Sequence, residues 1–319
     1  MREAEVLTRL RRIATAPEAR GLLDDVAVLD GLIITHDSIA EGVHFLATDP
    51  PASVGWKLVA VNLSDLAAKG ATPRGALLSL TLSGDSVWEA QFLDGLEAAC
   101  ETYGLPLIGG DTIALPQGAP RVLGLTAIGR AGERIPARDG ATAGDALWLI
   151  GSVGESAAGL AQLQQDSSAT GPLVDIFRRP VPQLGAGQAL APHAHAMIDV
   201  SDGLLLDAWR IAQASRCAVE IDLDALPLTS AFLAIRGGGL DERLFAATGG
   251  DDYALLLAAP AEFDPSTIYL PEGTSIVRIG MLSTGPPSLG VTSGGKPVPL
   301  PERLGFEHSS NHFSGPAAP

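Results

Sequence analysis

The chain has 319 residues, 46% apolar and 18% charged, and its 21 basic against 37 acidic side chains give a formal net charge of −16 at pH 7. This length exceeds what one hydrophobic core usually organises, so two domains are expected. The negative charge argues against binding of nucleic acid or anionic lipid, which needs a basic surface, but not against a phosphate ligand, because bound Mg²⁺ can reverse the local field.

The first half of the chain is predicted to mix helices and strands, beginning with an amphipathic helix at the N-terminus. The Asp30-Gly31 pair predicts a hairpin between strands at 26–29 and 32–35. Ser53 has the character of an N-cap for a long helix that ends at Ala68. Further expected elements are a strand at 76–82, a helix at 86–103, and strands at 105–108 and 122–128.

In the second half, residues 132–144 are rich in Gly, Ala and Arg and predict an inter-domain connection. We therefore expect domains at 1–135 and 136–306, followed by a disordered tail at 307–319. Two closely spaced prolines predict a loop at 178–182. Strands are expected at 146–150, 196–200, 218–223, 253–258 and 276–281, with helices after Gly154 and at 204–215. This irregular order favours an α+β chain of two domains over one doubly wound sheet.

Cysteine use and the N-terminal sequence bear on the compartment. Cys100 and Cys217 fit no metal motif and predict two buried thiols rather than a disulfide. Residues 1–14 lack the apolar segment of a signal peptide, and no apolar run approaches the length that spans a bilayer. A cytoplasmic protein without a membrane partner is expected by elimination.

Six short acidic segments carry the strongest functional signal, and most of them lie where an apolar run ends. They read Leu23-Asp24-Asp25, Thr35-His36-Asp37, Asn62-Leu63-Ser64-Asp65, Gly109-Gly110-Asp111-Thr112, Asp199-Val200-Ser201-Asp202-Gly203 and Gly249-Gly250-Asp251-Asp252-Tyr253. Several carboxylates cannot all stay ionised in one cavity without cations, because like charges raise each other's pKa. Mg²⁺ takes oxygen ligands and is often shared with substrate phosphates. Together the segments predict a metal-bridged phosphate site.

Each segment alone also fits a simpler role. An aspartate often closes a turn or caps a helix, and capping is the ordinary role for Asp202 before the predicted helix. The Gly109-Gly110 pair predicts a turn that lets the backbone approach a phosphate. The turn before Asp252 fits a substrate contact and a solvated loop equally well. No P-loop and no protein-kinase motif is present, so a nucleotide site would use a less common fold.

Taken in order, these segments resemble the thiamine-monophosphate kinases, a family of the aminoimidazole-ribonucleotide-synthetase-like superfamily. The resemblance spans Asp24 to about Phe306, and residues 61–68, 107–112 and 198–204 carry it most closely, while the Glu-Gly-Val-His-Phe segment at 41–45 is most typical of this kinase family. It implies ATP-dependent phosphorylation of thiamine monophosphate to the diphosphate by direct in-line transfer with several Mg²⁺ ions. It also implies a homodimer in which the N-terminal domains build a shared β-barrel, each with a C-terminal α/β sandwich.

The resemblance also assigns roles to single residues. Magnesium ligands would be Asp25, Thr35, Asp37, Asp65, Asp111 and Asp199, with Asp202 on a further ion and His36 contributing through its backbone if at all. Contacts with ATP would come from Asp25, Tyr103, Gly110, Asp111, Arg138 and Ser201. Contacts with thiamine monophosphate would come from His44, Asp251 and Phe306. From the local sequence alone, simpler roles also fit. Tyr103 would pack at a helix end, His44 would hydrogen-bond within a loop, and Arg138 would be a solvated surface residue.

The chain departs from the family pattern at isolated positions. Leu23 replaces a glycine, His36 a small hydroxyl residue, Lys69 an apolar residue, and Asp251 and Ala254 replace glutamates. Two alternatives follow. One is another ATP-using enzyme of the superfamily, acting on a formamidine, carbamoyl or selenide substrate, although no reactive cysteine lies near the N-terminus. The other is a catalytically silent nucleotide-binding protein. The sequence argues against it, because an acidic residue is present at every acidic metal position that the resemblance implies.

Overall fold

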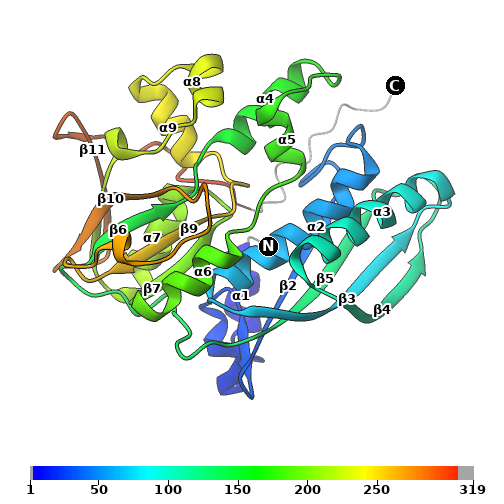
Figure 1. Cartoon of the computed structure of the whole chain (residues 1–319), viewed down its shortest axis with the longest axis horizontal. Coiled ribbons are helices and arrows are strands. Elements are labelled where there is room, and N and C mark those ends of the chain that lie inside the picture. The colour runs from blue at the N-terminus through cyan, green and yellow to red at the C-terminus, as the bar shows by residue number, and fades with distance from the viewer. Residues whose placement is uncertain (1–2, 308–319) are drawn as a thin grey trace.

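The structure is a computed structural model that describes residues 3–307, and it contains two sheets with helices packed on them (Figure 1). The elements of the first half are α1 (Glu3–Leu10), β1 (Ala27–Leu29), β2 (Leu32–Ala40), α2 (Pro51–Ala68), β3 (Thr72–Leu82), α3 (Ser86–Tyr103), β4 (Leu107–Ala114) and β5 (Val122–Arg130). Those of the second half are β6 (Ala146–Ile150), α4 (Glu155–Gln165), α5 (Pro172–Arg178), α6 (Leu184–Leu190), β7 (Ala196–Val200), α7 (Leu204–Ser215), β8 (Ala218–Asp222), α8 (Ser230–Arg236), α9 (Leu240–Thr248), β9 (Ala254–Ala259), β10 (Ile276–Ser283), β11 (Ser288–Ser293) and β12 (Lys296–Val298).

The N-terminal sheet has the strand order β1-β2-β5-β3-β4, and only the β3–β4 pair is parallel. Its strands place apolar side chains against α2 and α3, which lie side by side on one face of the sheet (Figure 1). Because β1 and β4 are different edges, the described sheet is open rather than closed into a barrel.

The C-terminal sheet has seven strands in the order β12-β11-β8-β10-β6-β9-β7, and only β8 and β11 run parallel. One core cluster packs its strands against α7 and α9, and a second cluster packs the other face against α6. The sheet is therefore covered on both sides, which explains why all residues of β7 and β9 are buried. Each half of the chain thus forms one mixed sheet with its own helices, which gives a two-domain α/β fold.

Helix α2 joins the two domains. It packs on β2 and β5, on α3, and on α6 and β7 of the second domain. Fifteen of its 18 residues are buried. The close contact with α3 depends on glycine, because a Cβ on Gly55 would lie 2.1 Å from the Phe92 carbonyl oxygen. The polar side chains Asn62, Asp65 and Lys69 therefore lie in the interior of the molecule rather than on a solvated face.

Several predicted elements agree with the structure to the residue, namely α3, β6, β7 and α7. Two local interpretations were wrong. Helix α2 begins at Pro51, because proline suits the first turn of a helix, so the N-cap position is Pro50 and Ser53 lies inside the helix. Gly109, Gly110 and Asp111 lie within strand β4 rather than in a turn. Gly110 is needed there because a Cβ would lie 2.1 Å from the Leu78 carbonyl oxygen of β3.

Other outcomes are simpler. Both cysteines are free, Cys217 buried and Cys100 half-buried. The boundary between residues 135 and 136 stays a prediction, and the expected disordered tail lies outside the described residues from 308 onward. None of the helices in the described range combines the length and apolar character that crossing a membrane requires.

Candidate active site

Three carboxylates from distant parts of the sequence meet between the two domains. Asp25 precedes β1, Asp65 lies on α2 and Asp199 on β7, and one oxygen of each lies within 4.8 Å of the others. Asp65 and Asp199 are buried. Every donor in this cluster is a carboxylate oxygen, which is the ligand type that Mg²⁺ prefers. The residues therefore fit a hard divalent cation.

Hydroxyl and amide groups hold the inner carboxylates in place. The Thr35 hydroxyl donates to Asp65, and the Ser64 hydroxyl donates to Asp199 Oδ2 at 2.7 Å. The backbone N–H of Asp37 donates to the Asn62 side-chain oxygen at 2.9 Å, which fixes β2 against α2. Residues 35 and 37 lie on the same face of β2, since side chains alternate along a strand. Strand β2 thus directs Thr35 and Asp37 toward the cluster.

The inner carboxylates are electrostatically unfavourable without a cation. Burial, followed by the charge of Asp37, raises the pKa of Asp65 well above its ordinary value. Burial and the charge of Asp25 do the same for the pKa of Asp199. Neighbouring carboxylates in a desolvated site cannot all be ionised unless a positive charge joins them. A bound cation would therefore release protons from this part of the cluster.

The outer end of the cluster is surrounded by basic side chains. Lys69 Nζ lies 2.7 Å from both Asp24 Oδ1 and Asp25 Oδ2, and Arg138 forms an ion pair with Asp25 Oδ1. Arg20 pairs with the second oxygen of Asp24 at 2.9 Å. Burial opposes ionisation of Asp25, but Lys69 and Arg138 outweigh it and hold its pKa well below the ordinary value. This end is compensated by the protein itself.

The loop after β7 presents Ser201 and Asp202 beside the cluster. The Asp202 carboxylate pairs with Arg210 at 2.6 Å. The N-cap residue of α7 is Gly203, so the capping role considered for Asp202 was wrong. The backbone N–H groups of Asp202 and Gly203 donate to Asp207 Oδ2 in the first turn of α7, each at 3.2 Å. Burial raises the pKa of Asp207 to about 7 despite its pairing with Arg210. Asp202 is therefore available for a role other than capping.

The last acidic segment packs against this loop. The Asp251 N–H donates to the Ser201 carbonyl oxygen at 2.6 Å. The Asp251 carboxylate accepts bonds from Lys57 Nζ at 2.5 Å and from the Tyr253 hydroxyl at 2.8 Å. Asp251 has a φ of 63°, in the left-handed region where aspartate is one of the few side chains that are enriched. The turn is therefore built into the site, and the interpretation as a solvated loop was wrong.

Comparison with known proteins identifies the family. A model described as AIR synthase related protein, N-terminal domain, matches residues 23–131, and its C-terminal counterpart matches residues 142–264. The thiamine-monophosphate kinase of Salmonella typhimurium is 38% identical over 303 residues, which are 90% of this chain and 91% of the relative. The chain belongs to the thiamine-monophosphate kinase family. A second family member, from Caulobacter vibrioides, is 37% identical and covers 96% of this chain and 90% of its own.

Solved structures of the thiamine-monophosphate kinase family share the fold. One is AaThiL complexed with AMPPCP and TMP, which superposes with a TM-score of 0.83 at 30% identity and covers 97% of each chain. Another is the enzyme from Stenotrophomonas maltophilia, with a TM-score of 0.73 at 35% identity, covering 91% of this chain and 95% of that one. Similarity at this level extends over both domains.

Some residues singled out by resemblance to the thiamine-monophosphate kinase family lie around the cluster rather than in it. The Phe306 N–H donates to the Asp202 carbonyl oxygen at 2.8 Å, which places Phe306 beside the same loop. His44 Nδ1 accepts a bond from the Ala40 N–H at 3.1 Å. The Tyr103 ring packs edge-on against Trp56 with centroids 5.5 Å apart, at the end of α3. Their ligand contacts stay predictions.

His36 and Asp111 lie further away. The His36 ring contacts the Thr126 hydroxyl at 2.9 Å and the Ser38 hydroxyl at 3.3 Å, on the face of β2 opposite to Thr35. Its imidazole therefore faces away from the carboxylates, so only its backbone could take part. Asp111 lies on exposed β4, three strands from β2, or roughly 14 Å at ~4.8 Å per strand. One chain alone does not bring Asp111 to the cluster.

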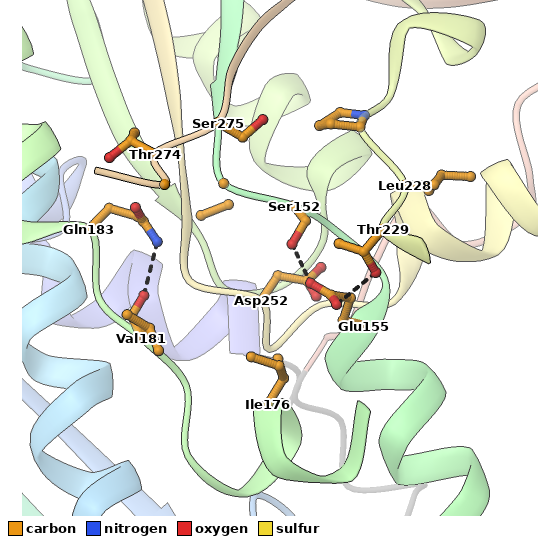
Figure 2. Close-up of a pocket in the computed structure, with 14 residues that line it drawn as sticks. Ser152, Glu155, Ile176, Val181, Gln183, Leu228, Thr229, Asp252, Thr274 and Ser275 are labelled. Carbon is orange, nitrogen blue, oxygen red and sulfur yellow. Dashed lines mark hydrogen bonds between the residues drawn. The ribbon is translucent and has the colours of Figure 1, made fainter. Parts of the chain in front are cut away.

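A cavity of about 400 Å³ is lined by Asp252, the residue that follows Asp251. Figure 2 shows Asp252 and Glu155 close together among the residues that line this cavity, and the Glu155 carboxylate accepts hydrogen bonds from the Ser152 and Thr229 hydroxyls. Asp252 accepts the Gly154 N–H at 2.9 Å and so holds the start of α4, while burial raises its pKa well above the ordinary value. Sequence reasoning missed this cavity, because Glu155 is indistinguishable from an ordinary acidic residue in the first turn of a helix.

Proposed function

We propose that this chain phosphorylates thiamine monophosphate with ATP, giving thiamine diphosphate and ADP. The observation that carries the proposal is the Asp25–Asp65–Asp199 cluster, which both domains build together. Relatives named thiamine-monophosphate kinase support it, because they match about nine tenths of the chain with the acidic segments included.

The chemistry asks the protein mainly for positioning and charge neutralisation. An oxygen of the acceptor phosphate attacks the γ-phosphorus of ATP in line, and the bond from that phosphorus to the bridging oxygen breaks, with ADP as the leaving group. The acceptor phosphate is already anionic at neutral pH, so no general base is needed. This agrees with a site that offers carboxylates, arginines and hydroxyls but no histidine in the cluster.

Several Mg²⁺ ions would be held by Asp25, Thr35, Asp37, Asp65 and Asp199, with Asp202 on a further ion. When bound, they supply positive charge to the phosphates between which the phosphoryl group moves. Arg138 lies beside Asp25, from where it would turn to an ATP phosphate. Ser201, on the loop after β7, would also contact ATP. Asp251, fixed by Lys57 and Tyr253, would face the acceptor together with His44 and Phe306.

We also propose a homodimer in which two N-terminal sheets join into a shared barrel. Edge strand β4 exposes apolar side chains, with Leu107 49%, Ile108 59% and Ile113 53% accessible. An exposed apolar edge strand normally needs cover. A partner at this edge would also bring Gly110 and Asp111 close to a neighbouring cluster. Sedimentation should give twice the chain mass, and Ile108→Glu should give the single mass; a monomeric wild type would contradict the dimer.

The decisive experiment incubates purified protein with ATP, Mg²⁺ and thiamine monophosphate and separates thiamine phosphates by chromatography. We expect thiamine diphosphate and ADP in equal amounts. Parallel reactions with thiamine and with formamidine, carbamoyl and selenide acceptors test the other enzymes of the superfamily. Turnover of one of these and none of thiamine monophosphate would overturn the proposal, and so would absence of turnover with every acceptor.

A further inference from the structure

Lys69 is a fully buried lysine whose ammonium group is enclosed by oxygen atoms. Its side chain is 0% exposed at the C-terminal end of α2. Nζ lies 2.7 Å from Asp24 Oδ1, 2.7 Å from Asp25 Oδ2 and 2.9 Å from the Met197 carbonyl oxygen. The Met197 carbonyl oxygen accepts a hydrogen bond from the ammonium group, and the two carboxylate oxygens form ion pairs with it. The lysine thus occupies the centre of a three-oxygen cation site.

The two ends of the cluster differ in how their charge is compensated. At the Asp24–Asp25 end, Lys69, Arg138 and Arg20 all form ion pairs. The contacts described for Asp65 and Asp199 at the other end come from the neutral hydroxyls of Thr35 and Ser64. The Asp65–Asp199 end, which Asp25 also faces, therefore favours a divalent cation. A further divalent cation between Asp24 and Asp25 is disfavoured, because Lys69 already contacts one oxygen of each of these carboxylates and like charges repel at this distance.

We propose that the Lys69 ammonium group takes the place of one divalent cation at the Asp24–Asp25 end of the cluster. The chain would then assemble its site with one metal ion fewer than the same chain carrying an apolar residue at this position. The proposal rests on the proposed function only in assuming that the cluster binds metal. It assigns Lys69 as a positioning residue, because Lys69 orients Asp25 without contacting the reacting atoms.

The test counts metal ions in the absence of nucleotide and acceptor. Full-length wild type and Lys69→Met are titrated with Mn²⁺, and bound ions are measured from the electron paramagnetic resonance signal of free Mn²⁺. We expect Lys69→Met to bind one more Mn²⁺ per chain than wild type and to gain more in melting temperature when Mn²⁺ is added. The same count and the same gain in both proteins would overturn the proposal and leave Lys69 as a structural ion pair.

Two further variants make the outcome specific. Lys57→Met removes the other fully buried lysine of α2, which pairs with Asp251 outside the cluster, and should leave the Mn²⁺ count unchanged. Lys69→Gln keeps most of the side-chain length without the charge and should behave as Lys69→Met does. If both neutral variants fold only when Mn²⁺ is present, the metal has replaced the ammonium group. If neither folds even with Mn²⁺, the metal cannot replace it, and the proposal is wrong.

This count is independent of the kinase reaction. A wild type that binds Mn²⁺ but forms no thiamine diphosphate would contradict the proposed function and leave the role of Lys69 intact. An active wild type together with equal Mn²⁺ counts in wild type and Lys69→Met would support the proposed function and contradict the role of Lys69.

Discussion

Helices α2 and α3 have equal length and lie side by side, yet they differ in how many of their residues are buried. Only five of the 18 residues of α3 are buried, at positions 88, 92, 95, 96 and 99, which is the stripe of an amphipathic helix. In α2 fifteen of 18 are buried, including Lys57, Asn62 and Asp65. Helix α3 is a cover for the sheet, whereas α2 is an interior element whose polar residues serve the site. A buried polar residue on α2 is therefore expected to matter for function, and a polar residue on the exposed face of α3 to matter less.

The largest effect that would sharpen this contrast comes from Asp65→Asn. The amide cannot supply the charge that a metal ion needs, so kcat/KM should fall by about 10³-fold. Stability of the metal-free protein should hold or rise, because a buried carboxylate with like-charged neighbours is removed. Steady-state kinetics and thermal melting measure the two effects. Parallel loss of activity and stability would show that Asp65 is merely structural.

Lys57→Met removes one partner of a buried ion pair and should destabilise the protein by about 3 kcal/mol. Lys57 is 1% exposed and also lies over the Phe177 ring at 4.0 Å, so little water can replace it. Urea unfolding measures the change. The double variant Lys57→Met with Asp251→Asn should recover part of the loss, because it leaves no unpaired charge. Additive losses would mean that the pair is not coupled.

Gly55→Ala tests packing between the two helices without touching the site. The added methyl group would lie 2.1 Å from the Phe92 carbonyl oxygen, so the helices must separate, at a cost of about 2 kcal/mol. Urea unfolding should show this loss, while the KM for ATP stays the same. The matched control is Leu93→Gln on the exposed face of α3, which should change stability by less than about 0.5 kcal/mol. Equal effects of both variants would erase the contrast between the helices.

The smallest effect concerns pH. The pKa of Asp65 is raised in the folded state, so its contribution to stability is present at low pH and is lost as pH rises above the ordinary carboxyl pKa of 3.8. In metal-free buffer, the melting temperature of Asp65→Asn should therefore gain on that of wild type as pH increases from 4 to 8. Saturating Mg²⁺ should close the gap. A gap independent of both pH and Mg²⁺ would rule out the charge as its cause.

The same contrast explains what the sequence could predict. The ends of helix α3 are set by local sequence signals, an Asp85 N-cap and a left-handed Gly104 after its last residue. Its bounds were therefore predicted to the residue. The carboxylates of 25, 65 and 199 could be grouped because acidic residues at the ends of apolar runs are conspicuous. Lys69 could not be interpreted this way, because its partners lie 45 and 128 residues away in sequence. Helices α5, α6, α8 and α9 were not predicted, since helices of seven to nine residues carry little periodic signal.

The burial of α2 between the two sheets has a consequence for how the molecule comes apart. Unfolding of either domain would remove the packing partners from one side of this helix. Its charged residues and their partners would then be exposed to water. The amide hydrogens of α2 should consequently be among the last to exchange with solvent, and both domains should lose structure in a single cooperative transition. The carboxylate cluster would then disperse in that same transition, so the chain could not release its metal gradually as it unfolds.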